Sequence, residues 1–472
     1  MHKILIFSLF AIWPAVSYSY DFYWTGNYSA EGVYLSGVDL GNSSDGDKQY
    51  INHHLFVKPE IIFYEGLSFH GGLDMLNGDD NSVPNTSRVG QIIGGNISSN
   101  QSSYTQDVPS PFAQRQFQKS RGVNISEAYL KYSHTSGELR LGRQPLEFGY
   151  GAFFSAGYNP FDHYYTNRDG ISYKFSMGAL SFTPLLNFMS DSLSEGSQSS
   201  EFGLKFGFSV EETGLDLGMM VLQRHTPQSI NSLNPVPGGE FGASKPITYS
   251  VFFNRKLERL SYGFEALAQD GSAGVDSAGN NISLKGFGIA AEVEWALGKW
   301  SLSSKFGYAS GNDPQNAAEV SSVAMHRNYN LGLILFNHPL GDASYDPTGT
   351  TLRGRNGSLG AAYSPDRTVD TDSISNAKYL APSIDYLINR KWKLNSTIVM
   401  AWLNETNVAV GGGEVSSYLG TELDFTFDYL PTENIIISTT AAYFAPGGAF
   451  EGSGAFSTDN SFGITTRLGV TF

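Results

Sequence analysis

The sequence predicts an all-β protein: a transmembrane antiparallel β-barrel of about 18 strands, with short periplasmic turns and long extracellular loops. Three observations lead to this fold class. Apolar and polar residues alternate with a period of two, an N-terminal apolar leader is followed by no spanning segment, and the connections alternate between short and long. Together they indicate a cylinder with an apolar outer surface and a polar interior.

Residues 1–19 have the features of a secretory signal peptide. His2 and Lys3 give a basic start, residues 4–16 are apolar, and small residues follow, including Ser17 and Ser19. The apolar run is too short for a transmembrane helix, and no later segment approaches the roughly 18 uninterrupted apolar residues that such a helix needs. We therefore expect an exported chain in which residues 20–472 form one barrel.

The composition excludes several other classes of protein. Of the 472 residues, 16% are charged and 14% are aromatic, none is Cys, and the formal net charge is −15. Charged residues make up about 25% of ordinary soluble domains, so this chain is unusually poor in them. An exported chain without Cys has no disulfides, and a negative chain is unsuited to nucleic acid. We expect no nucleic-acid partner.

Alternation is clearest in the segment SEAYLKYSHTSGELRLGRQ, residues 126–144. Ala128, Leu130 and Tyr132 fall on one face of its first half, and polar residues such as Glu127 fall on the other. Two such runs joined by a short polar turn indicate a β-hairpin. The apolar face is expected to contact outer-membrane lipid, and the polar face a water-filled lumen.

The same pattern recurs, without sequence repetition, in segments that begin at Phe202, Gly286 and Leu419. Their connections alternate between short turns and long loops rich in Asn, Asp, Gly and Ser. A soluble β-sandwich can also produce alternation, but it has no reason to gather its short turns at one end. The segregation of the turns therefore favours a barrel.

Aromatic residues follow the short turns on the apolar face, where a girdle at the membrane interface would lie. They are Tyr132, Trp295, Trp300, Trp392 and Tyr429. Ordinary β-favouring core residues would give the same composition. The last segment, SFGITTRLGVTF, ends at Phe472 and resembles the insertion signal of bacterial outer-membrane barrels. It predicts the bacterial outer membrane as the location and the barrel-insertion machinery as a partner through Phe472.

Two long extracellular loops are expected, at residues 77–122 and 310–376. The strand count of about 18 assumes that the second of them contains no barrel strand. Its run NYNLGLILFNH, from Asn328, leaves an alternative open, because a strand there with a partner raises the count to about 20. Loops of this length could fold inward and constrict a channel or remain outside as a cap.

Alternation assigns a set of charged side chains to the lumen, where we expect them to line a channel. They are Lys58, Glu127, Lys131, Arg140, Lys174, Lys205, Glu292, Glu294, Asp424 and Arg467. Basic residues concentrate between Val123 and Phe206, and acidic ones from Glu265 onward. This distribution predicts a transverse electric field across the pore, although opposite charges on neighbouring strands could equally brace the wall.

Two motifs give the sequence a family resemblance. Gly142, Arg143, Gln144, Leu146 and Gly149 in LGRQPLEFGYG, and Asn167, Arg168, Asp169 and Gly170 in TNRDGISYKF, resemble the signature of the alginate-export family of outer-membrane porins. The segment from Glu422 to Phe472 is similar to that family's last three strands. The resemblance implies passage of a hydrophilic polysaccharide or oligosaccharide, with the anionic alginate as one example, and it adds Arg143, Arg168 and Asp169 to the channel-lining set.

The sequence departs from the alginate exporters in two respects. The turn before the last strands is only YLPTEN where they carry a long periplasmic plug, and the lumen is more acidic than their arginine-rich funnel. These departures argue against alginate as the solute, but they do not affect the expectation that the protein is a porin.

The first functional hypothesis is a porin for passive passage of hydrophilic solutes, and the alternative is a non-conducting surface receptor or adhesin that uses the long loops. An enzyme is not expected, because an outer-membrane phospholipase needs Ser, His and Asn together on the outer wall, and no such context is present. Asp79, Asp80 and Asn81 have the character of a solvated turn, so no metal site or cofactor is expected.

Overall fold

The computed structural model describes residues 20–42, 47–75, 123–190, 198–225, 245–275, 280–313, 316, 318–338, 340–341, 347, 373–406 and 415–472. The expected signal peptide, residues 1–19, and the expected loop 77–122 lie outside the described residues. The expected loop 310–376 is described in part.

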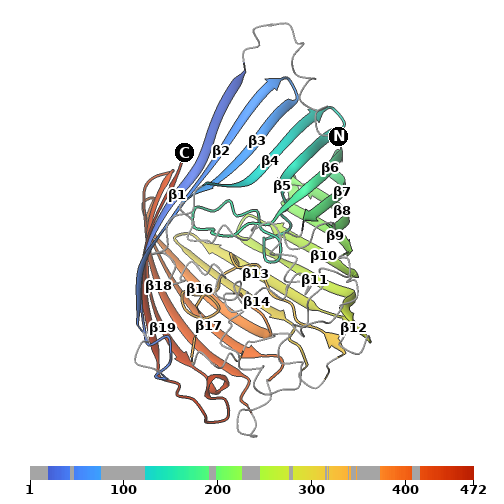
Figure 1. Cartoon of the computed structure of the whole chain (residues 1–472). Helices are drawn as coiled ribbons and strands as arrows, with labels where there is room; N and C mark the ends of the chain where they lie inside the picture. The colour runs from blue at the N-terminus through green and yellow to red at the C-terminus, as the bar shows by residue number, and fades with distance from the viewer. Residues whose placement is uncertain are drawn as a thin grey trace.

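The described strands form one antiparallel cylinder (Figure 1). Of its twenty strands, β12 (Asn281–Leu284) and β15 (Glu319–Val320) are short and lie beside the ring, and the other eighteen close it. The ring strands are β1 (Asp21–Ser36), β2 (Lys48–Tyr64), β3 (Leu67–Met75), β4 (Val123–His134), β5 (Gly137–Pro145), β6 (Asn167–Met177), β7 (Leu180–Ser190), β8 (Gln198–Val210), β9 (Leu215–His225), β10 (Lys245–Lys256), β11 (Leu260–Val275), β13 (Phe287–Leu297), β14 (Trp300–Ala309), β16 (Ala377–Asn389), β17 (Trp392–Leu403), β18 (Tyr418–Thr432), β19 (Ile435–Pro446) and β20 (Ser461–Thr471).

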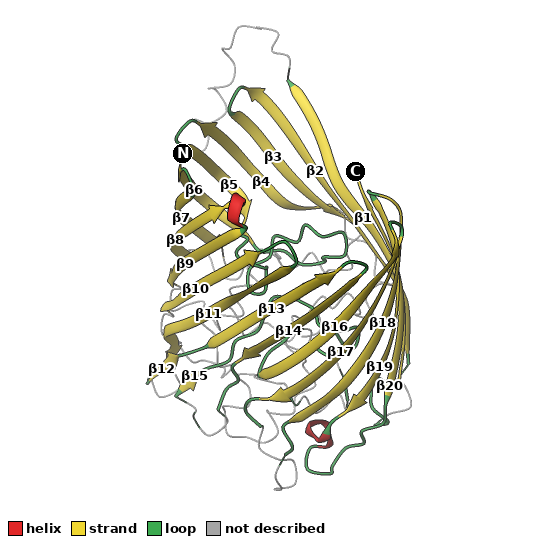
Figure 2. Ribbon diagram, turned by 180° about the vertical axis from the view of Figure 1, so that it is seen from behind, coloured by secondary structure: helices red, strands yellow, loops and turns green. Residues whose placement is uncertain are grey.

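Each ring strand pairs with its chain neighbour, and the cylinder closes where β1 pairs with β20, from Asn27 opposite Thr471 to Ser36 opposite Phe462. This pairing satisfies the backbone N–H and C=O groups of β1 and β20. In hydrocarbon, which offers no hydrogen-bond partners, those groups would otherwise stay unpaired. Two short 3-10 helices, η3 (Glu211–Thr213) and η7 (Gly448–Glu451), lie in connections (Figure 2). The described residues contain no helix of the length and apolarity needed to cross a bilayer.

The prediction of about 18 strands is confirmed, and the alternative of about 20 is wrong. The run from Asn328 to His338 forms bends and turns, not a strand. The apolar residues of this run are also compatible with a strand. In the structure they are instead buried in a cluster inside the barrel.

The outer face of the cylinder is apolar. Leu141 is 52% exposed and Phe206 40% exposed, and both belong to the face that alternation assigned to lipid. Near the short turns, Trp300 packs on Tyr386 and Trp392 on Tyr429, with ring centroids 4.3 Å and 4.0 Å apart. A closed antiparallel barrel with an even number of strands and this outer surface is the architecture of bacterial outer-membrane proteins. The chain is therefore an outer-membrane β-barrel.

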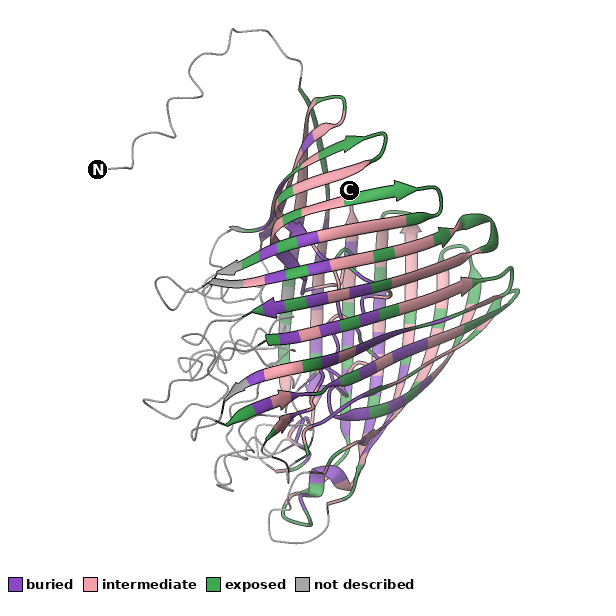
Figure 3. Ribbon diagram, turned by 90° about the vertical axis from the view of Figure 1, so that its right-hand side faces the viewer, coloured by how far each residue is buried: buried purple, intermediate pink, exposed green. Residues whose placement is uncertain are grey.

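Burial changes along the barrel axis (Figure 3). Apart from the outward-facing Phe287, β6 and β13 begin with buried or half-buried residues at the end that carries the long loops, and both end with exposed residues toward the short turns. The difference arises because two segments of the chain fold into the cylinder at the long-loop end. We call residues 146–166 the first inward segment and residues 321–338 the second inward segment; the first lies inside the ring of strands in Figures 1 and 2.

We expect Phe206→Arg to lower the free energy of unfolding in lipid vesicles by about 2–4 kcal/mol, because it places a cation on the lipid face near the middle of β8. Ser209→Arg is the matched control, since Ser209 is exposed on the lumen side opposite Asp216. Urea titration of both variants measures the difference. Equal losses would contradict the assignment of the two faces.

Candidate functional site

The first inward segment leaves the wall after β5 and returns to it at β6. Its apolar residues Phe148, Phe153 and Phe154 are buried against the inner wall. The wall is apolar at this level because lumen positions such as Met220 and Leu222 carry no charge. The segment is therefore held in place by burial of apolar surface against this part of the wall. A uniformly polar wall would not offer that surface.

A single buried carboxylate fixes the start of this segment. Glu265 of β11 accepts hydrogen bonds from the backbone N–H groups of Tyr150, Ala152 and Phe153, at 2.8, 3.1 and 3.2 Å. Gly149 has a φ of +61°, and a Cβ there would lie 2.6 Å from the Glu265 Oε2 atom. Glycine therefore permits both the left-handed turn and the approach of the carboxylate.

The second inward segment is anchored in the same way from another part of the wall. Glu422 of β18 accepts hydrogen bonds from the N–H groups of Ile334 at 2.7 Å and Leu335 at 2.6 Å, and Asp424 accepts one from Leu333 at 2.9 Å. All three carboxylates therefore serve the same purpose. Each satisfies loop amides that burial would otherwise leave without partners.

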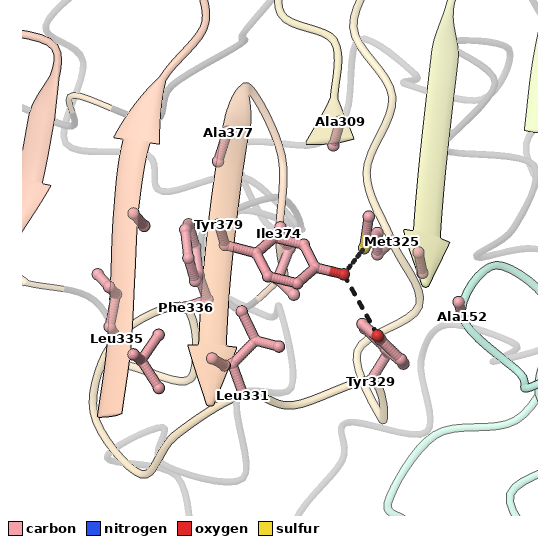
Figure 4. Close-up of a cluster of buried hydrophobic side chains, with 14 of the residues drawn as sticks. Ala152, Ala309, Met325, Tyr329, Leu331, Leu335, Phe336, Ile374, Ala377 and Tyr379 are labelled. Atoms are coloured by element: carbon pink, nitrogen blue, oxygen red, sulfur yellow. Dashed lines mark hydrogen bonds between the residues drawn. The ribbon is translucent and has the colours of Figure 1, made fainter. Parts of the chain in front are cut away.

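Figure 4 shows the apolar packing of this segment. Leu331, Leu335 and Phe336 lie in a buried cluster beside Tyr379 of β16. The hydroxyl of Tyr379 donates to the hydroxyl of Tyr329 at 3.2 Å. This cluster occupies part of the lumen at the long-loop end.

The two inward segments are also bonded to each other. The backbone N–H of His326 donates to the carbonyl of Ala152 at 2.7 Å, and the Asn328 side chain donates to the carbonyl of Tyr164, also at 2.7 Å. They form one constricting unit rather than two independent loops.

A cavity of about 440 Å³ remains between this unit and the wall. Its lining includes Glu147, Tyr158 and Asp162 from the first inward segment, and Glu292 and Lys305 from β13 and β14. Burial raises the pKa of Asp162 to about 6. The cavity is polar and carries charges of both signs, so it can hold water and hydrophilic solutes.

The basic side of the lumen lies on β2, β4, β5, β6 and β8. Lys58 lies 3.4 Å from Glu127, and its ammonium group is 3.6 Å from the ring centroid of Tyr158. The other predicted residues of this side also lie on the lumen face. Lys131 is 3.9 Å from Glu60, and Arg140 is 2.6 Å from Glu138. Lys174 is exposed opposite Glu138, and Lys205 donates to the Glu147 carbonyl at 2.8 Å.

On the acidic side, Glu292 lies 3.6 Å from Lys305, and Glu294 accepts a hydrogen bond from Ser301 at 2.8 Å. Arg467 of β20 lies over the ring of Phe161, 4.6 Å from its centroid. Asp424 faces the lumen but is covered by the second inward segment. Many of the predicted channel charges therefore brace the wall or hold the inward segments.

Arg168 is placed on the lumen face but is fully buried. Its Nε atom lies 2.8 Å from Glu201, which also accepts from Arg224 at 2.8 Å. Loss of Glu201 would leave two buried guanidinium groups without a counter-charge. Its position argues for a structural role rather than contact with a solute.

Arg143 and Asp169 do not line the channel, and their prediction as lining residues is wrong. The register places Arg143 opposite Ala128 and Asp169, on the face that carries Leu141. The two side chains form a bidentate pair on the outer surface, with N–O distances of 2.7 and 2.9 Å. Their place in a motif suggested the lumen, whereas strand parity assigns them to the outside.

Sequence reasoning missed the first inward segment and its tyrosines, Tyr150 and Tyr158. The signal was present, because LEFGYGAFFSAGYNPFDHYYT is a long connection rich in Gly and aromatic residues, with no period-two alternation. A long loop with so many large apolar residues needs a surface to bury them.

A pair of histidines ties the end of this segment to the wall. His163 lies 3.0 Å from Glu31 of β1, and its ring centroid is 5.4 Å from that of His54. Burial opposes protonation of His163, but the carboxylate of Glu31 outweighs burial, so the pKa of His163 is raised. The groups that face this pair are His54, Asp74, Asp162 and Arg467.

Within the described ranges, no group of three or more His, Cys, Asp or Glu side chains is arranged to hold a metal ion.

Comparisons with known proteins give fold similarity only. No protein-family model and no curated protein matches the chain. Solved structures that align with it include OccK9 of Pseudomonas aeruginosa, with 9% identity, a TM-score of 0.49 and coverage of 95% of this chain and 98% of that one. OccAB1 of Acinetobacter baumannii aligns with 12% identity, a TM-score of 0.49 and coverage of 95% and 97%. An anion-selective porin from Comamonas acidovorans aligns with 9% identity, a TM-score of 0.44 and coverage of 96% and 100%.

We expect Glu265→Leu to release the first inward segment, because three amides lose their acceptor and each buried group left unsatisfied costs about 1–3 kcal/mol. The chain has no Cys, so a spin label at Asn159→Cys reports the motion of the segment without interference. Glu258→Leu, in the short turn between β10 and β11, is the control. An unchanged label spectrum in Glu265→Leu would contradict the anchoring role.

The raised pKa of His163 also predicts a pH dependence. A raised pKa means that the pair with Glu31 stabilises the attached segment below the ordinary His pKa, and that this stabilisation is lost as the pH rises through the raised value. The label at Asn159→Cys should therefore become more mobile at alkaline pH, and His163→Gln should remove that transition. A transition that persists unchanged in His163→Gln would assign it to another group.

Proposed function

We propose that the protein is a passive outer-membrane channel for hydrophilic solutes, narrowed by its two inward segments. The observation that carries the proposal is the charged cavity of about 440 Å³ inside an eighteen-strand barrel. Barrels of 16–18 strands enclose an aqueous channel, whereas barrels of about eight strands are filled by side chains. The described site has no feature that calls for catalysis, and the proposal is of a channel rather than an enzyme.

Charge separation across the lumen supports selection among solutes. Lys131, Arg140 and Lys174 lie on β4, β5 and β6, while Glu292 and Glu294 lie on β13, about half the ring away. A pore with opposite charges on opposite walls orients polar solutes as they pass. Bracing pairs weaken the field without abolishing it, because Lys174 and Glu294 are exposed to the lumen.

A saccharide is the solute class that we favour. Exposed Tyr158, Asn159 and Asn330 side chains around the cavity offer a ring face and amide groups, which suit sugar rings and hydroxyls. An anionic polysaccharide such as alginate is less favoured, because Glu147, Asp162 and Glu292 line the same space. The motif residues that resemble the alginate-export family do not contact the cavity: Arg143 and Asp169 lie outside and Arg168 is buried.

One observation favours a second candidate, a non-conducting surface receptor. Apolar packing of the inward segments fills much of the lumen at the long-loop end. A planar bilayer containing the purified protein separates the candidates, because a channel gives discrete conductance steps. Silence at every voltage would favour the receptor.

For the charge separation, we expect Arg140→Glu combined with Lys174→Glu to lower the permeability of anions relative to cations by at least about twofold, because two lumen cations become anions. Zero-current potentials in a salt gradient measure the ratio. Arg143→Gln is the control, since it removes a cation from the outer face. A shift of equal size in the control would show that lumen charge does not set the selectivity.

A further inference from the structure

The cavity has the size of a binding site and is half open to the lumen. Its volume of about 440 Å³ lies within the range of roughly 300–1,000 Å³ that is usual for small-molecule pockets. Three separate elements build it: the first inward segment, the β13–β14 hairpin and the second inward segment. Because the inward segments are anchored by buried carboxylates and by each other, the cavity is formed before a solute arrives.

The lining carries more negative than positive charge. Glu147, Asp162 and Glu292 face one ammonium group, that of Lys305, which is 3.6 Å from Glu292 and balanced by it. The Glu147 side chain is exposed, and the nearby Lys205 bonds to its backbone carbonyl at 2.8 Å. Within the lining, the carboxylates of Glu147 and Asp162 therefore exceed the ammonium groups, and Lys58 and Lys205 from the neighbouring wall partly offset Glu147.

Two of the lining tyrosines already hold ammonium groups of the protein. The Nζ atom of Lys58 lies 3.6 Å from the ring centroid of Tyr158, and that of Lys305 lies 4.8 Å from the ring centroid of Tyr329. A cation within about 6 Å of an aromatic ring centroid is attracted by the negative face of the ring. The rings of this cavity therefore lie where ammonium groups of the protein are already stabilised, and the amine of a ligand would share that environment.

We propose that the cavity is a binding site for amine-bearing saccharides, a proposal that rests on the channel function above. The carboxylates of Glu147 and Asp162 would take the protonated amine, Tyr158 the face of the sugar ring, and Asn159 and Asn330 the hydroxyl groups. Solutes of this class would bind during passage, while neutral sugars of the same shape would pass with less retention.

The test uses single-channel current and two isosteric probes at neutral pH, the β-1,4-linked disaccharide of glucosamine and the neutral disaccharide cellobiose. We expect the aminated probe to block the current at a concentration at least about tenfold lower, since hydrogen bonds between charged groups contribute about 1.5–3 kcal/mol. Glu147→Gln should bring the two blocking concentrations together. Glu433→Gln removes one negative charge in the turn between β18 and β19, away from the cavity, and should leave the ratio unchanged.

Three results would overturn the inference. The first is a conducting channel that both probes block equally, and the second is one that a disaccharide of uronic acids blocks best. The third is an equal loss of preference in Glu147→Gln and Glu433→Gln. Each of these would leave the channel function intact. Failure of the protein to conduct at all would instead overturn the proposed function. Glu147→Gln is preferred to a change at Glu292, because Glu292 also contacts Lys305 and Tyr329.

Discussion

Closure of the sheet between β1 and β20 is the constraint on which the rest of the structure depends. Hydrocarbon offers no hydrogen-bond partners, so every strand edge must be paired within the chain. Once the sheet is closed, strand alternation fixes which side chains meet lipid and which face inward. Leu141 and Phe206 are exposed on one surface, while Glu265 and Glu422 are buried on the other. The interior is then the place where charged side chains can meet a passing solute.

The interior uses its carboxylates in two distinct ways. Glu265, Glu422 and Asp424 are buried and accept hydrogen bonds from the amides of the inward segments. Glu147 and Glu294 are exposed to the lumen and remain available to solutes. Burial separates the two roles, because a carboxylate that holds three amides in an apolar environment cannot also coordinate a passing molecule. An acidic lumen in the sequence is therefore not by itself evidence of cation selectivity.

Period-two alternation, together with the segregation of short turns from long loops, was sufficient to predict a barrel of about 18 strands, because lipid outside and water inside enforce the alternation on every strand. Arg143 and Asp169 were misplaced because a motif, rather than strand parity, assigned them to the channel. The first inward segment was missed because alternation describes only strands. Where Phe148 and Phe154 go depends on apolar wall residues from distant strands, such as Met220, which no local pattern connects to them. The cavity could not be predicted for the same reason, since three distant elements build it.

The pairing of β1 with β20 also bears on how the protein acquires its structure. The Ser461 hydroxyl donates to the carbonyl of Ser36 across 425 positions of the chain, whereas the short hairpins join residues only a few positions apart. Contacts so remote in sequence carry the largest loop-closure entropy and slow folding. Hairpins can form early and locally, but sealing the cylinder needs both edges of the sheet at once. A chain stalled before that step would present two unpaired edges, the form in which β-sheets aggregate.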